Sequence, residues 1–215
     1  MLELFETGGI MMYPLVLCSF LTLTVFFERL WSMRRAKIMI PEVITVVEQL
    51  NKKEDLNLAK SVCEKFDGPF PNIIVSTINN FNLAPEDLRV TVEDEGRQQV
   101  RTLSRGLSIL ETVAGIAPLL GLLGTVLGMI EVFNVIEELG VGQAKALSGG
   151  IAEALVTTAT GLFIGIPALI AFNYFNTRSE GLILDIENYV LILVNKIIHL
   201  KNEEAEPVEV RLRSE

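Results

Sequence analysis

The sequence is poor in the residues that most enzyme and metal sites need. It holds one histidine, His199, and two cysteines, Cys18 and Cys63, among 215 residues. Cys18 falls in an apolar run and Cys63 in a hydrophilic region, so their positions indicate neither a disulfide nor a metal site. The sequence also has no nucleophile paired with a base and no phosphate-binding loop. We therefore expect no enzyme activity, no cofactor and no metal site.

Positive charge is also scarce, since 18 Lys and Arg residues face 27 Asp and Glu residues and leave a net charge of −9. A nucleic-acid-binding protein would need a basic face, so this balance argues against that class. Part of the acidity lies in the last residues of the chain, where Glu203, Glu204, Glu206 and Glu209 are typical of a solvated tail. The acidity therefore predicts no binding site.

Charged residues are missing altogether from three long stretches, although they make up 21% of the chain. These stretches run from Thr7 to Phe27, from Thr112 to Ile130 and from Ala154 to Thr177. Each is close to or above the roughly 20 apolar residues that cross a bilayer. Lipid cannot satisfy backbone polar groups, so each stretch should be helical. With a mean hydropathy of +0.43, the sequence predicts an all-α integral membrane protein with three transmembrane helices and long cytoplasmic helical extensions.

The orientation follows from the basic residues near the spans. Arg29, Arg34, Arg35 and Arg178 flank the first and third spans, which places those flanks in the cytoplasm. The acidic start of the chain, with no small-residue cleavage site after the first apolar run, indicates a retained span rather than a removed signal. The predicted segments are an external N-terminus (1–9), a first span (10–27), a cytoplasmic helical domain (28–112), a second span (113–136), an external connector (137–149), a third span (150–175), a cytoplasmic helix (176–201) and a disordered acidic tail (202–215).

The cytoplasmic region reads as a series of helices. Helical periodicity predicts short helices from Pro41 to Leu50, from Leu56 to Phe66 and from Pro71 to Phe81. Proline and acids at 84–87 open a further helix, and we find no strong breaker after it until Gly115 and Pro118. We therefore expect one very long helix that runs from the cytoplasm into the second span. Residues 180–200 are so apolar that they need helical neighbours on most sides, including neighbours from other subunits.

Spans two and three both carry small residues at helix-packing intervals. Ala154, Gly161, Gly165 and Ala168 fall within about 60° of one another on a wheel of roughly 100° per residue. In lipid, such faces let helix backbones approach and gain dispersion contacts. The helix-packing candidates are Gly121, Gly124, Gly128, Gly161 and Gly165, and Pro118 and Pro167 are candidate kinks.

Four threonines and one carboxylate stand out in the same two spans. They are Thr125 in the second span and Thr157, Thr158, Thr160 and Glu153 in the third. A threonine hydroxyl can bond a carbonyl of its own helix one turn back, which is the ordinary interpretation of each one alone. Glu153 allows two interpretations: it faces a partner, cavity or ion path, or it sits at headgroup level near the helix N-terminus. Four hydroxyls in one helix pair favour a polar path.

At these residues the sequence resembles the MotA/TolQ/ExbB proton-channel family, and within it the ExbB/TolQ branch. The matching stretches are APLLGLLGTVLGMIEVF (117–133) and GGIAEALVTTATGLFIGIPALIAFNYF (149–175). The layout agrees as well, because a large insert follows the first of three spans, whereas MotA-like members have four. Two positions depart from the pattern: Thr157 stands where relatives of the TonB system tend to have a small apolar residue, and Glu131 is not required by the family.

The resemblance implies a ring of five copies around two copies of an ExbD/TolR-like partner, whose single span carries a proton-bearing aspartate. Thr125 and Thr158 would line the inner wall of the ring. Glu153 would lie on the same pore-facing helix as Thr158, and Thr157 would add a further hydroxyl. Ion flow would drive rotation and energise a TonB- or TolA-like transducer from the bacterial inner membrane, with the N-terminus in the periplasm. H⁺ is the expected ion and Na⁺ the alternative, because extra hydroxyls offer oxygen ligands.

Two other functions remain open. The chain could be a structural membrane scaffold that recruits cytoplasmic partners through residues 38–112 without conducting ions. A secondary transporter is a more distant alternative, since the sequence shows neither inverted repeats nor a midplane substrate site.

Overall fold

The computed structural model describes residues 8–140 and 144–212, and within these the chain is helical with no strand. Three of the described helices are long and apolar enough to cross a membrane. The predicted all-α class with three candidate spans is therefore confirmed. The helices are α2 (Met12–Ser32), α3 (Arg35–Ile38), α4 (Pro41–Gln49), α5 (Lys53–Cys63), α6 (Pro69–Asn79), α7 (Pro85–Ser104), α8 (Leu107–Leu139) and α9 (Ala144–Leu212).

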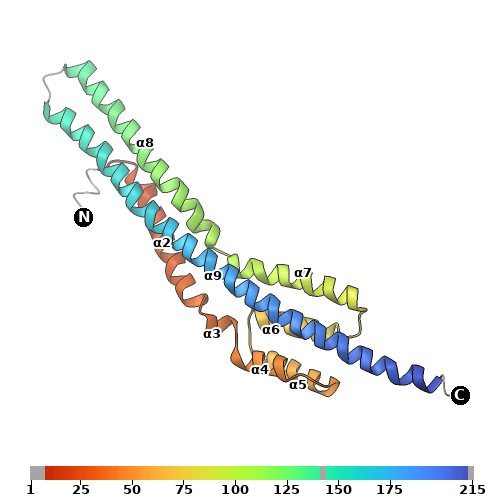
Figure 1. The fold of residues 1–215 in the computed structure, drawn as a ribbon. Coiled ribbons are helices and arrows are strands. Elements are labelled where there is room, and N and C mark those ends of the chain that lie inside the picture. Colours follow the sequence, from red (N-terminus) through yellow and green to blue (C-terminus); the bar gives the residue numbers. More distant parts are fainter. Residues whose placement is uncertain (1–7, 141–143, 213–215) are drawn as a thin grey trace. The chain divides into compact units, whose positions relative to one another are not determined.

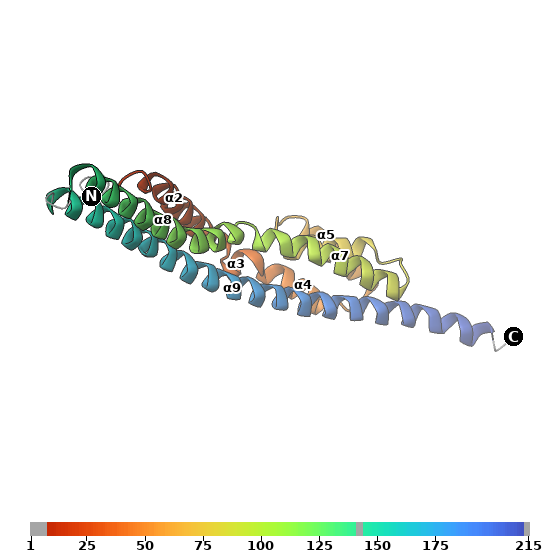
Figure 2. The same cartoon turned by 90° about the horizontal axis from the view of Figure 1, so that it is seen from above.

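The chain divides into two compact units that share α9. The first, which we call the span unit, contains the chain up to Trp31 and Gly106–Asn176. Here α8 and the first part of α9 run side by side, with α2 against them (Figures 1 and 2). One apolar cluster joins the three helices through Leu15 of α2, Ala117 of α8 and Ala168 of α9. The α2 helix also packs at its other end, where Phe26 meets Phe175 edge to face.

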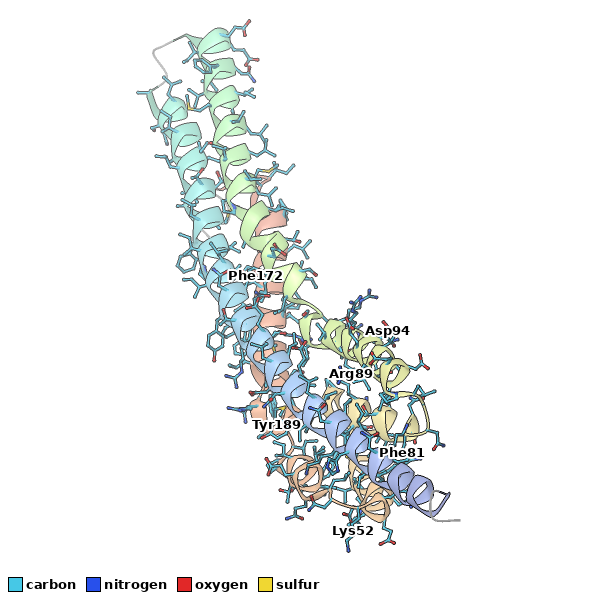
Figure 3. All side chains as sticks on the ribbon, turned by 45° about the vertical axis from the view of Figure 1, so that its right-hand side comes forward. Lys52, Phe81, Arg89, Asp94, Phe172 and Tyr189 are labelled. Carbon is cyan, nitrogen blue, oxygen red and sulfur yellow. The ribbon has the colours of Figure 1, made fainter. Side chains whose placement is uncertain are left out.

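The second unit, which we call the bundle unit, contains Ser32–Arg105 and the chain from Thr177 onward. Its core is formed by α3–α7 and the later part of α9, with fully buried side chains such as Val43, Phe70, Leu88 and Leu193. Tyr189, which is labelled in Figure 3, lies on α9. Its ring packs against that of Phe70, with the centroids 5.9 Å apart. This core confirms that residues 180–200 have helical neighbours within the chain, and neighbours from other subunits stay a prediction.

Basic side chains of α9 bind backbone carbonyls at the ends of the shorter segments. Lys196 Nζ donates to the carbonyl oxygens of Val47, at 3.1 Å, and of Glu48, near the last turn of α4. Lys201 Nζ donates to Leu83 O, and Arg178 Nε donates to Met33 O at 2.7 Å. A cation at a helix C-terminus satisfies carbonyls that have no partner within their own helix. The basic side chains that interrupt the apolar sequence of α9 therefore bind this helix to the other segments of the bundle unit.

The expectation of one long helix entering the second span is wrong. The chain leaves the helical conformation at Arg105 and Gly106, and Gly106 has φ +82°. A glycine in the left-handed region commonly ends a helix, because it has no Cβ to clash. Gly115 and Pro118, which we expected to be the breakers, lie inside α8. A helix interior tolerates an isolated glycine. Transmembrane helices also tolerate proline, because neighbouring groups satisfy the backbone groups that it frees.

Two further boundaries differ from expectation. The connector predicted at 137–149 is shorter, because α8 continues to Leu139 and α9 begins at Ala144; residues 141–143 lie outside the described chain. The tail predicted to be disordered from 202 is helical to Leu212. Glutamate and alanine are good helix formers, and extension of an existing helix avoids the cost of nucleation.

Replacement of Gly106 by alanine should destabilise the protein by about 1 kcal/mol, because an L-residue is strained in the left-handed region. A Cβ at this position would lie 3.7 Å from Arg29 Nε, an ordinary contact, so strain is the main cost. The matched control is Gly96→Ala in α7, where a Cβ meets nothing within 4 Å. That change should stabilise the helix by up to about 1 kcal/mol. Thermal unfolding in detergent measures both, and equal shifts would contradict the assignment.

The Cys63 thiol should resist alkylation in the folded protein. Burial, with a smaller contribution from Glu64, raises its pKa to about 11, and only the thiolate is nucleophilic. The unfolded thiol ionises from about pH 8.5, whereas the folded thiol keeps its proton up to about pH 11. The free energy of unfolding therefore falls as the pH rises through this range. Maleimide labelling with and without denaturant, and unfolding of Cys63→Ala against wild type across this pH range, measure both effects. Rapid labelling of folded Cys63 would contradict it.

Candidate functional site

The candidate site is built on the contact between α8 and α9, where two helix backbones meet closely. A Cβ on Gly161 would lie 2.5 Å from Ala117 O, and one on Gly121 would lie 3.0 Å from Thr157 O. Gly124 has no room for a Cβ beside the Thr157 side chain. The remaining two glycines of the predicted set are equally close, since Gly128 faces Ala154 and Gly165 faces the Pro118 ring. All five predicted glycines lie in this contact.

A side-chain hydrogen bond crosses this contact. Thr158 Oγ1 of α9 donates to Gly121 O of α8 at 2.9 Å. The bond depends on the glycine contact, because a threonine hydroxyl reaches a neighbouring backbone only where the two helices lie close together. Thr158 is half-buried. A threonine oxygen that donates its proton still has acceptor capacity, so Thr158 can take a hydrogen bond from water or from an acid.

The other three threonines bond to their own helices. Thr125 Oγ1 donates to Leu122 O at 2.6 Å and Thr160 Oγ1 to Val156 O at 2.8 Å. Thr157 Oγ1 donates within α9, at 2.9 Å from Ala154 O and 3.1 Å from Glu153 O. The ordinary interpretation of an intramembrane threonine therefore holds for these three. Of the four threonines, Thr158 is the one whose hydroxyl bonds to the neighbouring helix.

Exposure separates the candidate path residues into two groups. Thr125, Thr158 and Glu153 are half-buried in the span unit, so part of each side chain remains open to a neighbour. Thr157 is 1% exposed and fills the space beside Gly124. The structure thus places the Thr157 side chain in the packing between α8 and α9, whereas the other three side chains are partly exposed. The role of all four in an ion path stays a prediction.

Glu153 precedes the three threonines of α9 and lies close to two other features. Its charge interacts with that of Glu131 on α8, whose side chain is exposed. Its carboxyl group contacts Gly9, in the turn before α2. The sequence pattern did not indicate this second contact, because the two residues are far apart in the chain. The pair Gly8-Gly9 was the available signal, since adjacent glycines mark a turn.

The two prolines predicted to kink the spans occupy different surroundings. Pro118 lies inside α8, with its ring against Gly165. Pro167 lies inside α9 and is exposed. Neither proline ends its helix, and the kinks stay a prediction.

Comparison with known proteins assigns this helix pair. Residues 66–188 match the profile of the MotA/TolQ/ExbB proton channel family, a range that includes α8 and the candidate residues of α9. The chain belongs to this family. Its relatives place it on the ExbB-like branch.

Three relatives cover most of the chain. The Synechocystis biopolymer transport protein ExbB-like 1 is 36% identical, over 80% of this chain and 69% of that protein. ExbB-like 3 from the same organism is 28% identical, over 93% of this chain and 97% of that protein. The biopolymer transport protein ExbB of Pseudomonas putida is 30% identical, over 94% of this chain and 65% of that protein. Family membership and three candidate spans describe a multi-pass membrane protein of a proton-channel and transport family.

Alanine at Gly124 or Gly161 should destabilise the helix pair by about 1–3 kcal/mol, the usual cost of overpacking. The new methyl group would overlap with Thr157 in the first case and with Ala117 O in the second. Gly115→Ala is the matched control in the same membrane helix, because its Cβ would meet nothing within 4 Å. Thermal unfolding of the three variants in detergent measures the difference. A control as unstable as the two variants would show that the close approach is not the cause.

Proposed function

We propose that the chain is the ring-forming subunit of an ion-driven inner-membrane motor, which conducts protons together with a one-span partner. The observation that carries the proposal is the Thr158 hydroxyl, which is bonded across the α8–α9 contact to Gly121 O and is left half-open. Membership of a proton-channel family supports the same function. The N-terminus lies in the periplasm and the C-terminus in the cytoplasm, as the basic residues after α2 indicate.

The threonines suit transient contact with a proton carrier. The hydroxyl protons of Thr125 and Thr158 are held by carbonyl oxygens, so both oxygens are free to accept. They can accept from water or from a protonated carboxylic acid in this arrangement. To bind a carboxylate, a hydroxyl must release its carbonyl and donate instead. The two states of an acid therefore meet two different hydrogen-bond arrangements.

The proton-carrying acid comes from another chain in this proposal. The three charge-free stretches contain no aspartate, and Glu153 borders the third of them. A partner of ExbD/TolR type, with one span and an intramembrane aspartate, would supply the acid. Rotation of ring and partner would then energise a TonB- or TolA-like transducer.

Several copies of the chain are needed to enclose such a partner. The α8–α9 contact uses the small residues, and large apolar side chains of the span unit remain on the outside, among them Phe163, which is 80% exposed, and Leu119, which is 63% exposed. These faces suit lipid and neighbouring copies. A ring of five around two partners is the family arrangement and is part of the proposal.

A structural scaffold is the second candidate function, and one feature of the bundle unit favours it. A groove of about 930 Å³ lies between α7 and α9, with apolar side chains such as Val92 and Val190 and with Arg89 and Arg101. A cytoplasmic partner could be recruited there without ion conduction.

Ion flux into vesicles that contain the chain and a one-span, aspartate-bearing partner tests the proposal. Thr158→Val keeps the side-chain shape and removes the hydroxyl, so flux should fall to the level measured without the partner. The lost bond should cost only about 0.6 kcal/mol of stability, so the oligomer should persist. Thr24→Val is the matched control, because Thr24 lies on α2, outside the α8–α9 contact, and its hydroxyl bonds to Phe20 O of its own helix. This variant should retain flux.

Separate H⁺ and Na⁺ gradients identify the ion in the same vesicles. Flux under the H⁺ gradient alone is expected. An intact oligomer that conducts neither ion with any partner would overturn the motor and favour the scaffold.

A further inference from the structure

The turn that precedes the first span lies directly against Glu153. A Cβ on Gly9 would overlap with Glu153 Oε1 and would lie 2.7 Å from its Cδ. Gly8 is buried and Gly9 half-buried, whereas Ile10 is 70% exposed. The glycine face of the turn therefore covers part of the carboxyl group, and the side chain of Ile10 does not.

Glycine is required at position 9 for two independent reasons. Its φ of +60° is a left-handed conformation that residues with a Cβ adopt at a cost. The space that a Cβ would occupy is also filled by the Glu153 carboxyl group. The turn is tied to the first membrane helix, since Met12 N donates to Gly9 O at 3.2 Å. The start of α2 thus fixes the position of the glycine beside the carboxylate.

We propose that the Gly8–Gly9 turn is a positioning element for Glu153, which covers its carboxyl group and limits the directions in which that group can point. Glu153 precedes the threonines of α9. The segment before the first span would therefore set the orientation of this carboxylate at the outer end of the proposed ion path. The cover follows from the contact alone, and its consequence for ions rests on the proposed function.

The cover predicts a difference in chemical labelling. A water-soluble carbodiimide with an amine nucleophile modifies accessible carboxyl groups, and peptide mass spectrometry reports the yield at each position. Glu131 is an exposed carboxylate on the neighbouring helix α8, so it serves as an internal reference. In Gly9→Ala the new methyl group displaces the carboxyl group, and the ratio of labelling at Glu153 to labelling at Glu131 should rise severalfold.

Ile10→Ala is the matched control, because it shortens an exposed side chain in the same turn. It should leave the ratio unchanged. An unchanged ratio in Gly9→Ala, or an equal rise in both variants, would overturn the proposal.

A cross-link tests the contact without the alanine variant. The Gly9 Cβ position lies 3.5 Å from Glu153 Cγ. The Sγ of a cysteine at position 153 would take the place of this Cγ, so an Sγ on residue 9 can reach it to form an S–S bond of about 2.05 Å. In a chain that carries Cys18→Ser and Cys63→Ala, the pair Gly9→Cys and Glu153→Cys should oxidise readily. The pair Gly9→Cys and Leu155→Cys should not, because Leu155 is 64% exposed on another side of α9. Equal oxidation of both pairs would overturn the proposal.

Flux separates this proposal from the proposed function. In vesicles with the partner, Gly9→Ala should reduce flux in the wild-type background and should have no further effect in Glu153→Ala. A chain that conducts nothing while labelling and cross-linking succeed would contradict the motor and keep the cover. Full flux in Gly9→Ala together with an unchanged labelling ratio would contradict the cover and keep the motor.

Discussion

The close approach of two helix backbones in the span unit is the constraint on which the candidate site depends. Helices in lipid gain nothing from burying apolar surface against one another, so association relies on dispersion contacts and interhelical hydrogen bonds. Glycines at the α8–α9 contact provide both. They bring the backbones together, and the resulting distance lets Thr158 reach the carbonyl of Gly121. A bulkier contact would leave that hydroxyl to bond within α9, as Thr160 does.

The α9 helix carries two kinds of packing along its length, and its sequence changes accordingly. In the span unit its contact face is made of small residues that meet backbone. In the bundle unit the face becomes large and apolar, with Leu182, Ile186 and Leu193 in the core. The sequence predicts that the bundle unit lies in water, which would drive burial of its apolar surface. Lys196 and Lys201 lie in the bundle unit, where their ammonium groups donate to carbonyls that have no partner within a helix.

Hydropathy and periodicity predicted most of the fold, because spans and amphipathic helices leave a signal in every residue that they contain. The break at Gly106 escaped prediction because it depends on the backbone conformation of a single glycine, and the sequence around it is otherwise helical. The five packing glycines were found because their spacing repeats. The contact of Gly9 with Glu153 was missed because no local pattern encodes a pairing over such a sequence distance.

The position of Thr157 bears on which ion the proposed path would carry. An additional hydroxyl on the path would favour Na⁺, since a bare cation needs several oxygen ligands at once. Thr157 is buried beside Gly124, and its hydroxyl is bonded to carbonyls of its own helix. Fewer oxygens therefore remain for a cation than the sequence suggested. A proton moves along hydrogen bonds between water and hydroxyl groups, each of which can accept and donate, so it needs no such set of oxygens at one point. In the proposed motor, the burial of Thr157 therefore fits H⁺ better than Na⁺.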